Sequence, residues 1–257
     1  MSIKHFFLFF KYNKIMSRKI VTLLDYKIDT FTFAEAIEYA KQLIDRGSVT
    51  QVVTINPEMI ELGDRDKNYK RILDDADLVI PDGVGIQLGL KIESHNVQRI
   101  AGIEFAYKML EVASQNDIPV ALVGAKREIN EQACKNLRKD FPNLNIVYSK
   151  DGYFENNEEV FNELKQCSPR LILVALGAPK QEEFINHAKN YINPALMIGV
   201  GGSFDVWAGA VERAPEIYRK LGLEWLYRTV KQPQRFKRIF PTLPLFIWKV
   251  MKEKFNL

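Results

Sequence analysis

The chain contains few cysteines, and their placement excludes several kinds of structure. Cys134 and Cys167 are the only two among 257 residues, and they match no metal-ligand or redox spacing. Disulfide frameworks and zinc sites both need recurring cysteine spacings, so neither is expected here. This usage fits a reducing cytosol, and we assign neither thiol a chemical role.

The chain also lacks a convincing signal peptide, internal repeats and low-complexity linkers. Its first apolar run, 5–10, has lysines on both sides, but it is too short to cross a bilayer and no small-residue cleavage site follows. Met16 precedes the first clear strand pattern, so we expect residues 1–18 to be an N-terminal extension outside the fold. With 47% hydrophobic residues, the rest can bury a full-sized core in one large domain, or in one domain plus an appendage.

Acidic residues are scarce in the last part of the chain. Residues 213–257 contain eleven lysines or arginines and three aspartates or glutamates, a local net charge of +8 within an overall +4. Aromatic side chains are interleaved with these cations, as is typical of an element at a lipid interface. We therefore expect an appendage that binds an anionic membrane surface, with Lys249, Lys252 and Lys254 among its membrane-facing cations. Two alternatives stay open: single-stranded nucleic-acid binding, and an ordinary amphipathic helix packed on the domain with its cations in water.

The rest of the sequence alternates between two periodicities. Short apolar runs rich in β-branched residues lie at 20–24, 51–55, 78–80, 120–123, 145–148, 171–175 and 196–200. Segments with a helical period separate them, and Thr32 begins one helix with a capping box. This βαβα pattern predicts an α/β fold, a doubly wound, mostly parallel, Rossmann-like sheet over residues 19–212. The alternation stops after Gly209, so 213–257 is the predicted helical basic appendage, divided at Pro241.

Ligands of open parallel sheets bind beyond the carboxyl ends of the strands, so the residues that follow each apolar run are candidates for a site. Asp82, between Pro81 and Gly83, is the best acid–base candidate. A carboxylate at the rim of the crevice can accept a proton from a substrate hydroxyl. Aspartate before glycine is also a common turn residue or helix N-cap, and this alternative stays open.

Two further strand ends carry a glycine turn or a polar helix start. Gly201 and Gly202 lack a Cβ, so their amides can approach an anionic ligand closely, although such turns also occur without a ligand. Gln181 lies in the first turn of a helix predicted to begin at Pro179, where its amide either meets a ligand or is solvated.

Two Asp-x-Asp pairs have the same spacing as the metal sites of some sugar-nucleotide enzymes. They lie at 64 and 66 and at 75 and 77, before a strand and not at its carboxyl end. We interpret them as surface charge, and we expect neither a metal site nor a cofactor.

Several longer motifs point to one family. They are TINPE at 54–58, PDGVG at 81–85, RIAG at 99–102, ALGAPKQE at 175–182, GVGGSFD at 199–205, RAP at 213–215 and LGLEWLYR at 221–228. In their order and spacing, from about Lys19 to the tail, they resemble the WecG/TagA/CpsF family, which is glycosyltransferase family 26.

The resemblance implies an inverting, metal-independent transfer of an N-acetylmannosamine-type sugar from a UDP-sugar to undecaprenyl-diphosphate-linked N-acetylglucosamine, in cell-wall or surface-polysaccharide synthesis. It implies that Asp82 is the general base. It also implies that the substrate contacts come from Thr54, Asn56, Arg99, Gln181 and the tail arginines Arg228, Arg235 and Arg238. The tail arginines recur at helical spacing, although Pro233 should kink or break the helix that carries them.

Two other classes of function remain as alternatives to the glycosyltransferase. A nicotinamide-dependent oxidoreductase needs a Gly-x-Gly-x-x-Gly turn after an early strand, and the first apolar run leads into DYKID at 25–29 instead. A nucleic-acid-binding module would leave Asp82 and the glycine turn unexplained. We therefore expect a cytoplasmic enzyme, peripheral on the inner face of the cell membrane, with no nucleic-acid partner; a homo-oligomer is left open.

Overall fold

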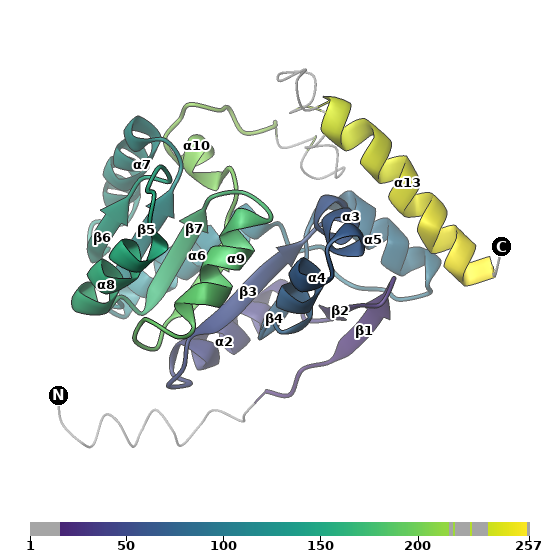
Figure 1. Ribbon diagram of the computed structural model, residues 1–257, viewed down its shortest axis with the longest axis horizontal. Helices are drawn as coiled ribbons and strands as arrows, with labels where there is room; N and C mark the ends of the chain where they lie inside the picture. The colour runs from purple at the N-terminus through teal and green to yellow at the C-terminus, as the bar shows by residue number, and fades with distance from the viewer. Residues whose placement is uncertain (1–15, 216–217, 219–226, 228–235, 256–257) are drawn as a thin grey trace.

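A computed structural model describes residues 16–215, 218, 227 and 236–255 of the chain (Figure 1). Within these residues, six parallel strands form one sheet in the order β4-β3-β8-β7-β5-β6. Their bounds are β3 (Thr50–Ile55), β4 (Leu78–Pro81), β5 (Val120–Gly124), β6 (Ile146–Lys150), β7 (Leu171–Ala175) and β8 (Leu196–Gly199). The prediction of a doubly wound α/β fold is confirmed.

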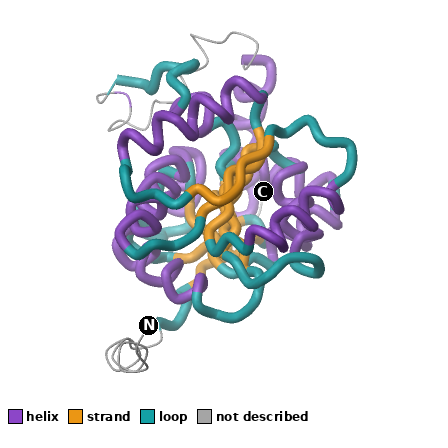
Figure 2. Tube along the Cα trace, turned by 90° about the vertical axis from the view of Figure 1, so that its left-hand side faces the viewer, coloured by secondary structure: helices purple, strands orange, loops and turns teal. Residues whose placement is uncertain are grey.

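Helices cover both faces of this sheet (Figure 2). One face packs against α2 (Phe33–Ile44), α6 (Gly102–Gln115), α7 (Arg127–Asp140) and α10 (Ser203–Trp207). The other packs against α3 (Pro57–Arg65), α4 (Lys67–Asp74), α5 (Gly83–Ile92), α8 (Asn157–Cys167) and α9 (Lys180–Ala188). Because both faces are covered, the inner strands are buried along their whole length, and this is why they read as continuous apolar runs.

The start of α2 follows from its sequence. The Thr32 hydroxyl accepts from the Glu35 backbone N–H, and the Glu35 carboxylate accepts from the Thr32 backbone N–H at 2.7 Å. The predicted capping box is therefore confirmed, and the apolar stripe that follows it is buried on the sheet.

The first apolar run does not enter the sheet, so the prediction for 20–24 is wrong in this respect. Strand β1 (Ile20–Leu23) pairs antiparallel with β2 (Tyr26–Asp29) in a separate hairpin. Leu24 and Asp25 form the two-residue turn, with φ angles of 49° and 60°. Both angles are positive, as a type I′ hairpin turn requires, and such a turn leaves no room for a crossover helix.

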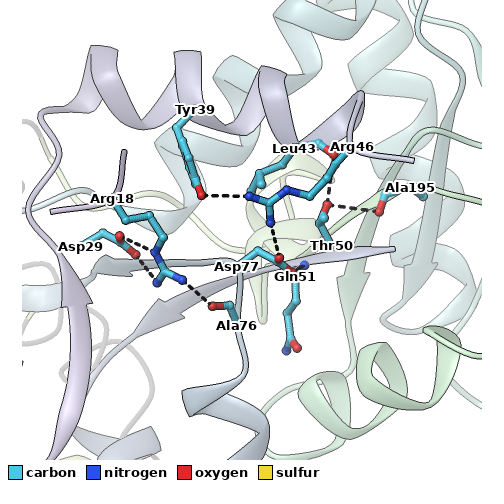
Figure 3. A network of polar contacts seen from close by, with 10 residues as sticks. All are labelled: Arg18, Asp29, Tyr39, Leu43, Arg46, Thr50, Gln51, Ala76, Asp77 and Ala195. Carbon is cyan, nitrogen blue, oxygen red and sulfur yellow. Dashed lines mark hydrogen bonds and ion pairs between the residues drawn. The ribbon is translucent and has the colours of Figure 1, made fainter. Parts of the chain in front are cut away.

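A network of polar contacts joins this hairpin to the sheet (Figure 3). The Asp29 carboxylate is fully buried and accepts two hydrogen bonds from the Arg18 guanidinium, at 2.7 and 2.8 Å. It also accepts from the Val79 backbone N–H in β4. Arg18, which the sequence places in the N-terminal extension, thus contacts the core.

The same network fixes the amino ends of the inner strands. The Asp77 carboxylate accepts from the Arg46 guanidinium and from the Gln51 backbone N–H, while the Thr50 hydroxyl donates to the backbone oxygen of Ala195 (Figure 3). The carboxyl ends, where a ligand would bind, lie at the opposite edge of the sheet.

The C-terminal helix α13 (Phe236–Phe255) packs on α3 and α5 (Figure 1). Phe246 and Val250 are fully buried and belong to the same hydrophobic cluster as the hairpin and β4. The helix runs unbroken through Pro241, so the predicted division at that residue is wrong. The predicted appendage therefore shares a core with the α/β domain along this helix.

The lysines of α13 have different environments. Lys249 forms ion pairs with Glu61 at 2.9 Å and Asp64 at 2.7 Å, and Lys254 lies 3.6 Å from Glu93. The expectation that Lys249 faces a membrane is therefore wrong, because it docks α13 onto α3. Lys252 instead lies over the ring of Trp248.

Among the described residues, none of the helices combines the length and the apolar composition that crossing a bilayer requires.

Candidate active site

The strand order places the switch point of the sheet, called the crevice below, at the carboxyl ends of β3 and β8. These two strands are neighbours in the parallel sheet, and the helices that follow them, α3 and α10, pack on opposite faces. Open α/β sheets bind ligands at such a topological switch point. The two motifs that follow these strands, at 54–58 and 199–205, therefore meet at this switch point.

The end of β3 supplies two of the predicted residues. The Thr54 side chain is buried, and its hydroxyl lies 3.4 Å from the backbone oxygen of Gly199 in β8. Asn56 is the N-cap of α3 and accepts a hydrogen bond from the Met59 backbone N–H at 3.1 Å. Both side chains thus have structural contacts while they border the crevice.

Asp82 lies at the end of β4, beside Thr54 and Asn56. Its backbone N–H donates to the Ile55 oxygen at 2.9 Å, which fixes the residue against the end of β3. Asp82 occupies the N-cap position of α5, but its carboxylate accepts no capping hydrogen bond. Asp82 therefore occupies the N-cap position, as the alternative interpretation expects, but its side chain does not cap the helix.

The loop before α6 brings Arg99 to the same edge of the sheet. The backbone N–H of Ile100 donates to the oxygen of Pro81, the last residue of β4. Arg99, the residue before Ile100, therefore lies beside the end of β4, where it is half-buried. A Cβ on Gly102 would lie only 2.8 Å from the Thr54 methyl carbon, so glycine lets α6 begin directly against Thr54.

In the turn after β8, one of the two amides that were expected to face a ligand has a partner within the protein. The Gly201 N–H donates to the side-chain oxygen of Gln181 at 3.0 Å, so this amide is already paired inside the protein. Gly201 adopts a φ of +49°, a left-handed conformation that favours glycine. Gly202 follows as the N-cap residue of α10. Binding of an anionic ligand by this turn stays a prediction.

Gln181 is buried and not solvated, being only 4% exposed in the first turn of α9. Its side-chain nitrogen donates to Glu182 at 2.7 Å, and the other Glu182 oxygen accepts from the Tyr69 hydroxyl at 3.0 Å. Burial raises the pKa of Glu182 to about 7, although the hydrogen bonds from Gln181 and Tyr69 lower it. Burial likewise raises the pKa of Tyr69.

Sequence reasoning missed Glu182 and Tyr69. Glu182 is adjacent to Gln181 in the motif at 175–182, which is a signal that could have drawn attention to it. Tyr69 comes from α4, more than a hundred residues away, and no local pattern marks it.

A cavity of about 170 Å³ opens next to Asp82, between the first turns of α3 and α5 and the helix α13. It is lined by Asn56, Pro57, Glu58, Gly83, Val84, Gly85, Thr242 and Leu243. A Cβ on Gly85 would lie only 2.5 Å from Pro57 in α3 and 2.8 Å from Leu243 in α13, so glycine lets α5 pack closely against both helices. The cavity is therefore shaped by both the α/β core and the C-terminal helix.

Of the three predicted tail arginines, one lies within the described residues. Arg228 and Arg235 lie outside the described residues, and Arg238 lies in the first turn of α13. Within the described part of the chain, His, Cys, Asp and Glu side chains do not gather in groups of three or more that could hold a metal ion.

Three of the four carboxylates in the two Asp-x-Asp pairs have identifiable contacts. Asp64 accepts from the Tyr26 hydroxyl and pairs with Lys249, and Asp66 caps α4. Asp77 belongs to the network at the amino edge of the sheet. These contacts place the three side chains away from the carboxyl ends of the strands.

Comparison with known proteins identifies a family. The model of the family described as "Glycosyl transferase WecG/TagA/CpsF family" matches residues 21–257. The match covers the crevice residues and the C-terminal helix.

Curated relatives match over most of their length. The N-acetylglucosaminyldiphosphoundecaprenol N-acetyl-beta-D-mannosaminyltransferase of Bacillus subtilis (strain 168) is 33% identical over 217 residues, which is 84% of each chain. Proteins of the same name are 31% identical in Bacillus spizizenii, over 93% of each chain, and 33% identical in Staphylococcus aureus (strain MW2), over 91% of this chain and 93% of the relative.

Proposed function

Because the chain belongs to the WecG/TagA/CpsF family of glycosyltransferases, we propose that it transfers an N-acetylmannosamine-type sugar from a UDP-sugar to N-acetylglucosamine on undecaprenyl diphosphate. The names of the relatives supply the sugar and the acceptor. The observation that carries the proposal is the position of Asp82, whose backbone is fixed at the carboxyl end of β4, beside the end of β3.

In this proposal Asp82 is the general base. Its carboxylate takes the proton from the acceptor hydroxyl as the oxygen attacks the anomeric carbon from the face opposite the leaving UDP. The new bond forms on that face, so the configuration at the anomeric carbon inverts. The cavity next to Asp82 holds the acceptor sugar, with Asn56 at its wall.

The leaving UDP lies on the β8 side of the crevice. Gly202, Arg99 and the tail arginines Arg228, Arg235 and Arg238 offset the charge that develops on its diphosphate. No divalent metal is required for this step. The structural contacts of Asp64, Asp66 and Asp77 support a role for these carboxylates outside the reaction.

We also propose that the enzyme is peripheral on the inner face of the cell membrane, where its lipid-linked acceptor would be found. Helix α13 supports this placement because it has two apolar sides. Phe246 and Val250 pack on the domain, whereas Leu245, Trp248, Met251 and Phe255 are exposed. Exposed aromatic and aliphatic side chains beside lysines are typical of an interfacial helix.

The decisive experiment is Asp82→Asn, which keeps the shape of the side chain and removes its basicity. Sugar transfer from UDP-N-acetylmannosamine to a lipid-diphosphate N-acetylglucosamine acceptor is measured as UDP release in excess EDTA, in which the wild-type protein stays active. We expect kcat to fall by about 10²- to 10⁴-fold, the usual contribution of a general base. Affinity for the UDP-sugar changes little.

Asp66→Asn is the matched control, since it makes the same chemical change at the N-cap of α4, where asparagine caps equally well. Its turnover should equal that of the wild type. If Asp82→Asn retains more than about a tenth of wild-type turnover, well above the expected range, Asp82 is not the general base.

A further inference from the structure

A buried carboxylate lies directly behind the Gly201–Gly202 turn and has no part in the proposed transfer step. Glu182 is 1% exposed, and its two oxygens accept from the Gln181 amide nitrogen and the Tyr69 hydroxyl. Gln181 in turn accepts from the Gly201 N–H. These contacts form a continuous chain from α4 through α9 to the turn at the crevice.

The hydrogen bonds to the Glu182 carboxylate determine how the Gln181 side-chain amide is oriented. The Gln181 NH₂ group faces Glu182, whose carboxylate only accepts hydrogen bonds once it is ionised, above its pKa of about 7. The Gln181 oxygen then faces Gly201, where it meets a backbone donor. If the amide flipped, its NH₂ group would oppose the Gly201 N–H and two donors would be unpaired in a buried site. Glu182 therefore selects the one amide orientation that holds the turn.

The backbone of β8 is shaped to admit this contact. A Cβ on Gly199 would lie 2.6 Å from the Gln181 side-chain nitrogen and 3.0 Å from a Glu182 oxygen. Only a glycine at this position lets the two side chains pass so close to the strand. Gly201, two residues later, takes the left-handed conformation in which its N–H reaches Gln181.

We propose that Glu182 and Tyr69 are positioning residues for sugar transfer: they fix the amide of Gln181 and, through it, the Gly201–Gly202 turn at the crevice. The expected effect on turnover rests on the proposed transferase function. The expected effect on the stability of the turn rests on the geometry alone. The turn ends β8 at the switch point, so a loose turn displaces the groups that surround the leaving diphosphate.

The first test measures the turn without any substrate. Hydrogen exchange of the Gly201 amide is followed by mass spectrometry in Glu182→Met, Gln181→Met and Tyr69→Phe. We expect exchange to become roughly fivefold to tenfold faster in the first two variants, as the loss of one hydrogen bond would give. A smaller increase in the exchange rate is expected in Tyr69→Phe. This variant removes a single hydroxyl, so it still tests the proposal if Glu182→Met does not fold.

Tyr148→Phe is the matched control, because the Tyr148 hydroxyl also donates to a glutamate, Glu163, but does so at the edge strand β6. It should leave exchange at Gly201 unchanged. Unchanged exchange at Gly201 in Glu182→Met and Tyr69→Phe would overturn the proposal, whatever reaction the enzyme catalyses.

The second test is a double-mutant cycle on turnover. Glu182→Met should lower kcat by roughly tenfold to a hundredfold at an unchanged KM for the acceptor, since small displacements at a reacting centre have effects of this size. In a Gln181→Met background the same substitution should lower kcat no further. Glu182→Gln, which still offers an oxygen to Gln181, should restore part of the loss.

Additive losses in the cycle would show that Glu182 does not act through Gln181, and the positioning role would then be wrong. A wild-type protein that transfers no sugar would refute the proposed function instead, while the exchange experiment still decides whether Glu182 holds the turn.

Discussion

Three buried polar side chains of this protein differ in how fully their hydrogen-bonding groups are paired. The Asp29 carboxylate has a bidentate arginine and a backbone N–H. Within the part of the chain that the structure describes, Glu182 accepts from two neutral donors and from no cation. Gln51, fully buried in β3, has no hydrogen-bond partner for either side-chain amide atom among the described residues. The hydrogen-bonding groups are paired most fully in Asp29 and least in Gln51.

Glu182 predicts a pH dependence of folding. Its pKa is raised from 4.5 to about 7, chiefly by burial, with a smaller contribution from Glu183 on the same helix. Below about pH 4.5 the carboxyl group is protonated in both states. As the pH rises to about 7 the unfolded state ionises first, so the free energy of unfolding falls by roughly 3 kcal/mol, at about 1.4 kcal/mol for each tenfold change in proton affinity.

Urea unfolding of the wild type and Glu182→Gln between pH 4.5 and 8 measures this effect. The stability of the wild type relative to the variant should decrease with rising pH and level off above about pH 7. A constant difference across this range would mean that Glu182 titrates at an ordinary pKa.

Gln51→Met predicts a gain in stability. Methionine has a similar shape and needs no hydrogen bonds, so the free energy of unfolding should rise by about 1–3 kcal/mol, the cost of burying an unpaired polar group. Thermal unfolding followed by circular dichroism provides the measurement. A lower melting temperature would indicate that the Gln51 amide has a partner after all.

At the scale of elements, local chemistry explains which parts of the fold were predictable. The start of α2 was predicted because a capping box is formed by residues three apart. Asp82 was found because a buried strand ends directly before it. The β1–β2 hairpin was missed because its turn, Leu24-Asp25, contains none of the Asn-Gly or Asp-Gly pairs that usually signal a type I′ turn.

For helix α13, the contacts of individual side chains could not be predicted from the sequence. Its basic and aromatic composition indicated a surface element, but composition does not reveal which lysine has a partner. Lys249 pairs with Glu61, whose side chain is only 8% exposed, and with Asp64. Both partners come from α3, nearly two hundred residues earlier in the chain.

Lys249→Glu should therefore detach α13 from α3. The change places a third carboxylate beside Glu61 and Asp64, so we expect the free energy of unfolding to fall by at least about 2 kcal/mol. Limited proteolysis should also cleave the C-terminal helix faster. Chemical unfolding and digestion time courses measure the two effects.

Lys252→Glu is the control, because Lys252 lies on the outer side of the same helix, over the Trp248 ring. Its stability should stay within about 0.5 kcal/mol of the wild type, as for most surface substitutions. Equal behaviour of the two variants would show that the Lys249 ion pairs do not hold the helix.

At the scale of the whole molecule, the order of the strands assembles the candidate site. The motifs at 54–58, 81–85, 175–182 and 199–205 are spread over some 150 residues. They meet because β4, β3, β8 and β7 are consecutive in the sheet. No periodicity in the sequence specifies that order, which depends on contacts between distant segments, so the residues could be predicted but their mutual contacts could not.

The contact between Gln181 and Gly201 is an example. Both residues were predicted to bind substrate because each follows a strand. Their mutual hydrogen bond depends on β7 and β8 being neighbours, which brings the start of α9 beside the turn after β8. Each residue therefore has a structural role that its motif alone does not reveal.

The outer side of α13 gives the last prediction, which concerns how the molecule meets a membrane. Trp248 and Phe255 are 57% and 60% exposed, on the side of the helix opposite to the buried Phe246 and Val250. Replacing both by serine removes apolar surface without touching the docked side. We expect affinity for vesicles containing phosphatidylglycerol to fall at least about tenfold, because burying a large apolar side chain contributes about 1.5 kcal/mol or more.

Sedimentation with vesicles measures the affinity, and transfer to a short-chain soluble acceptor measures the site. The double variant should bind vesicles more weakly and keep soluble-acceptor turnover, because neither residue lines the cavity next to Asp82. Tyr191→Ser, which removes an exposed aromatic residue beyond the end of α9, is the control and should sediment as the wild type does. If the double variant still sediments fully, the membrane contact lies elsewhere on the molecule, because the exposed side of α13 would then add nothing to binding.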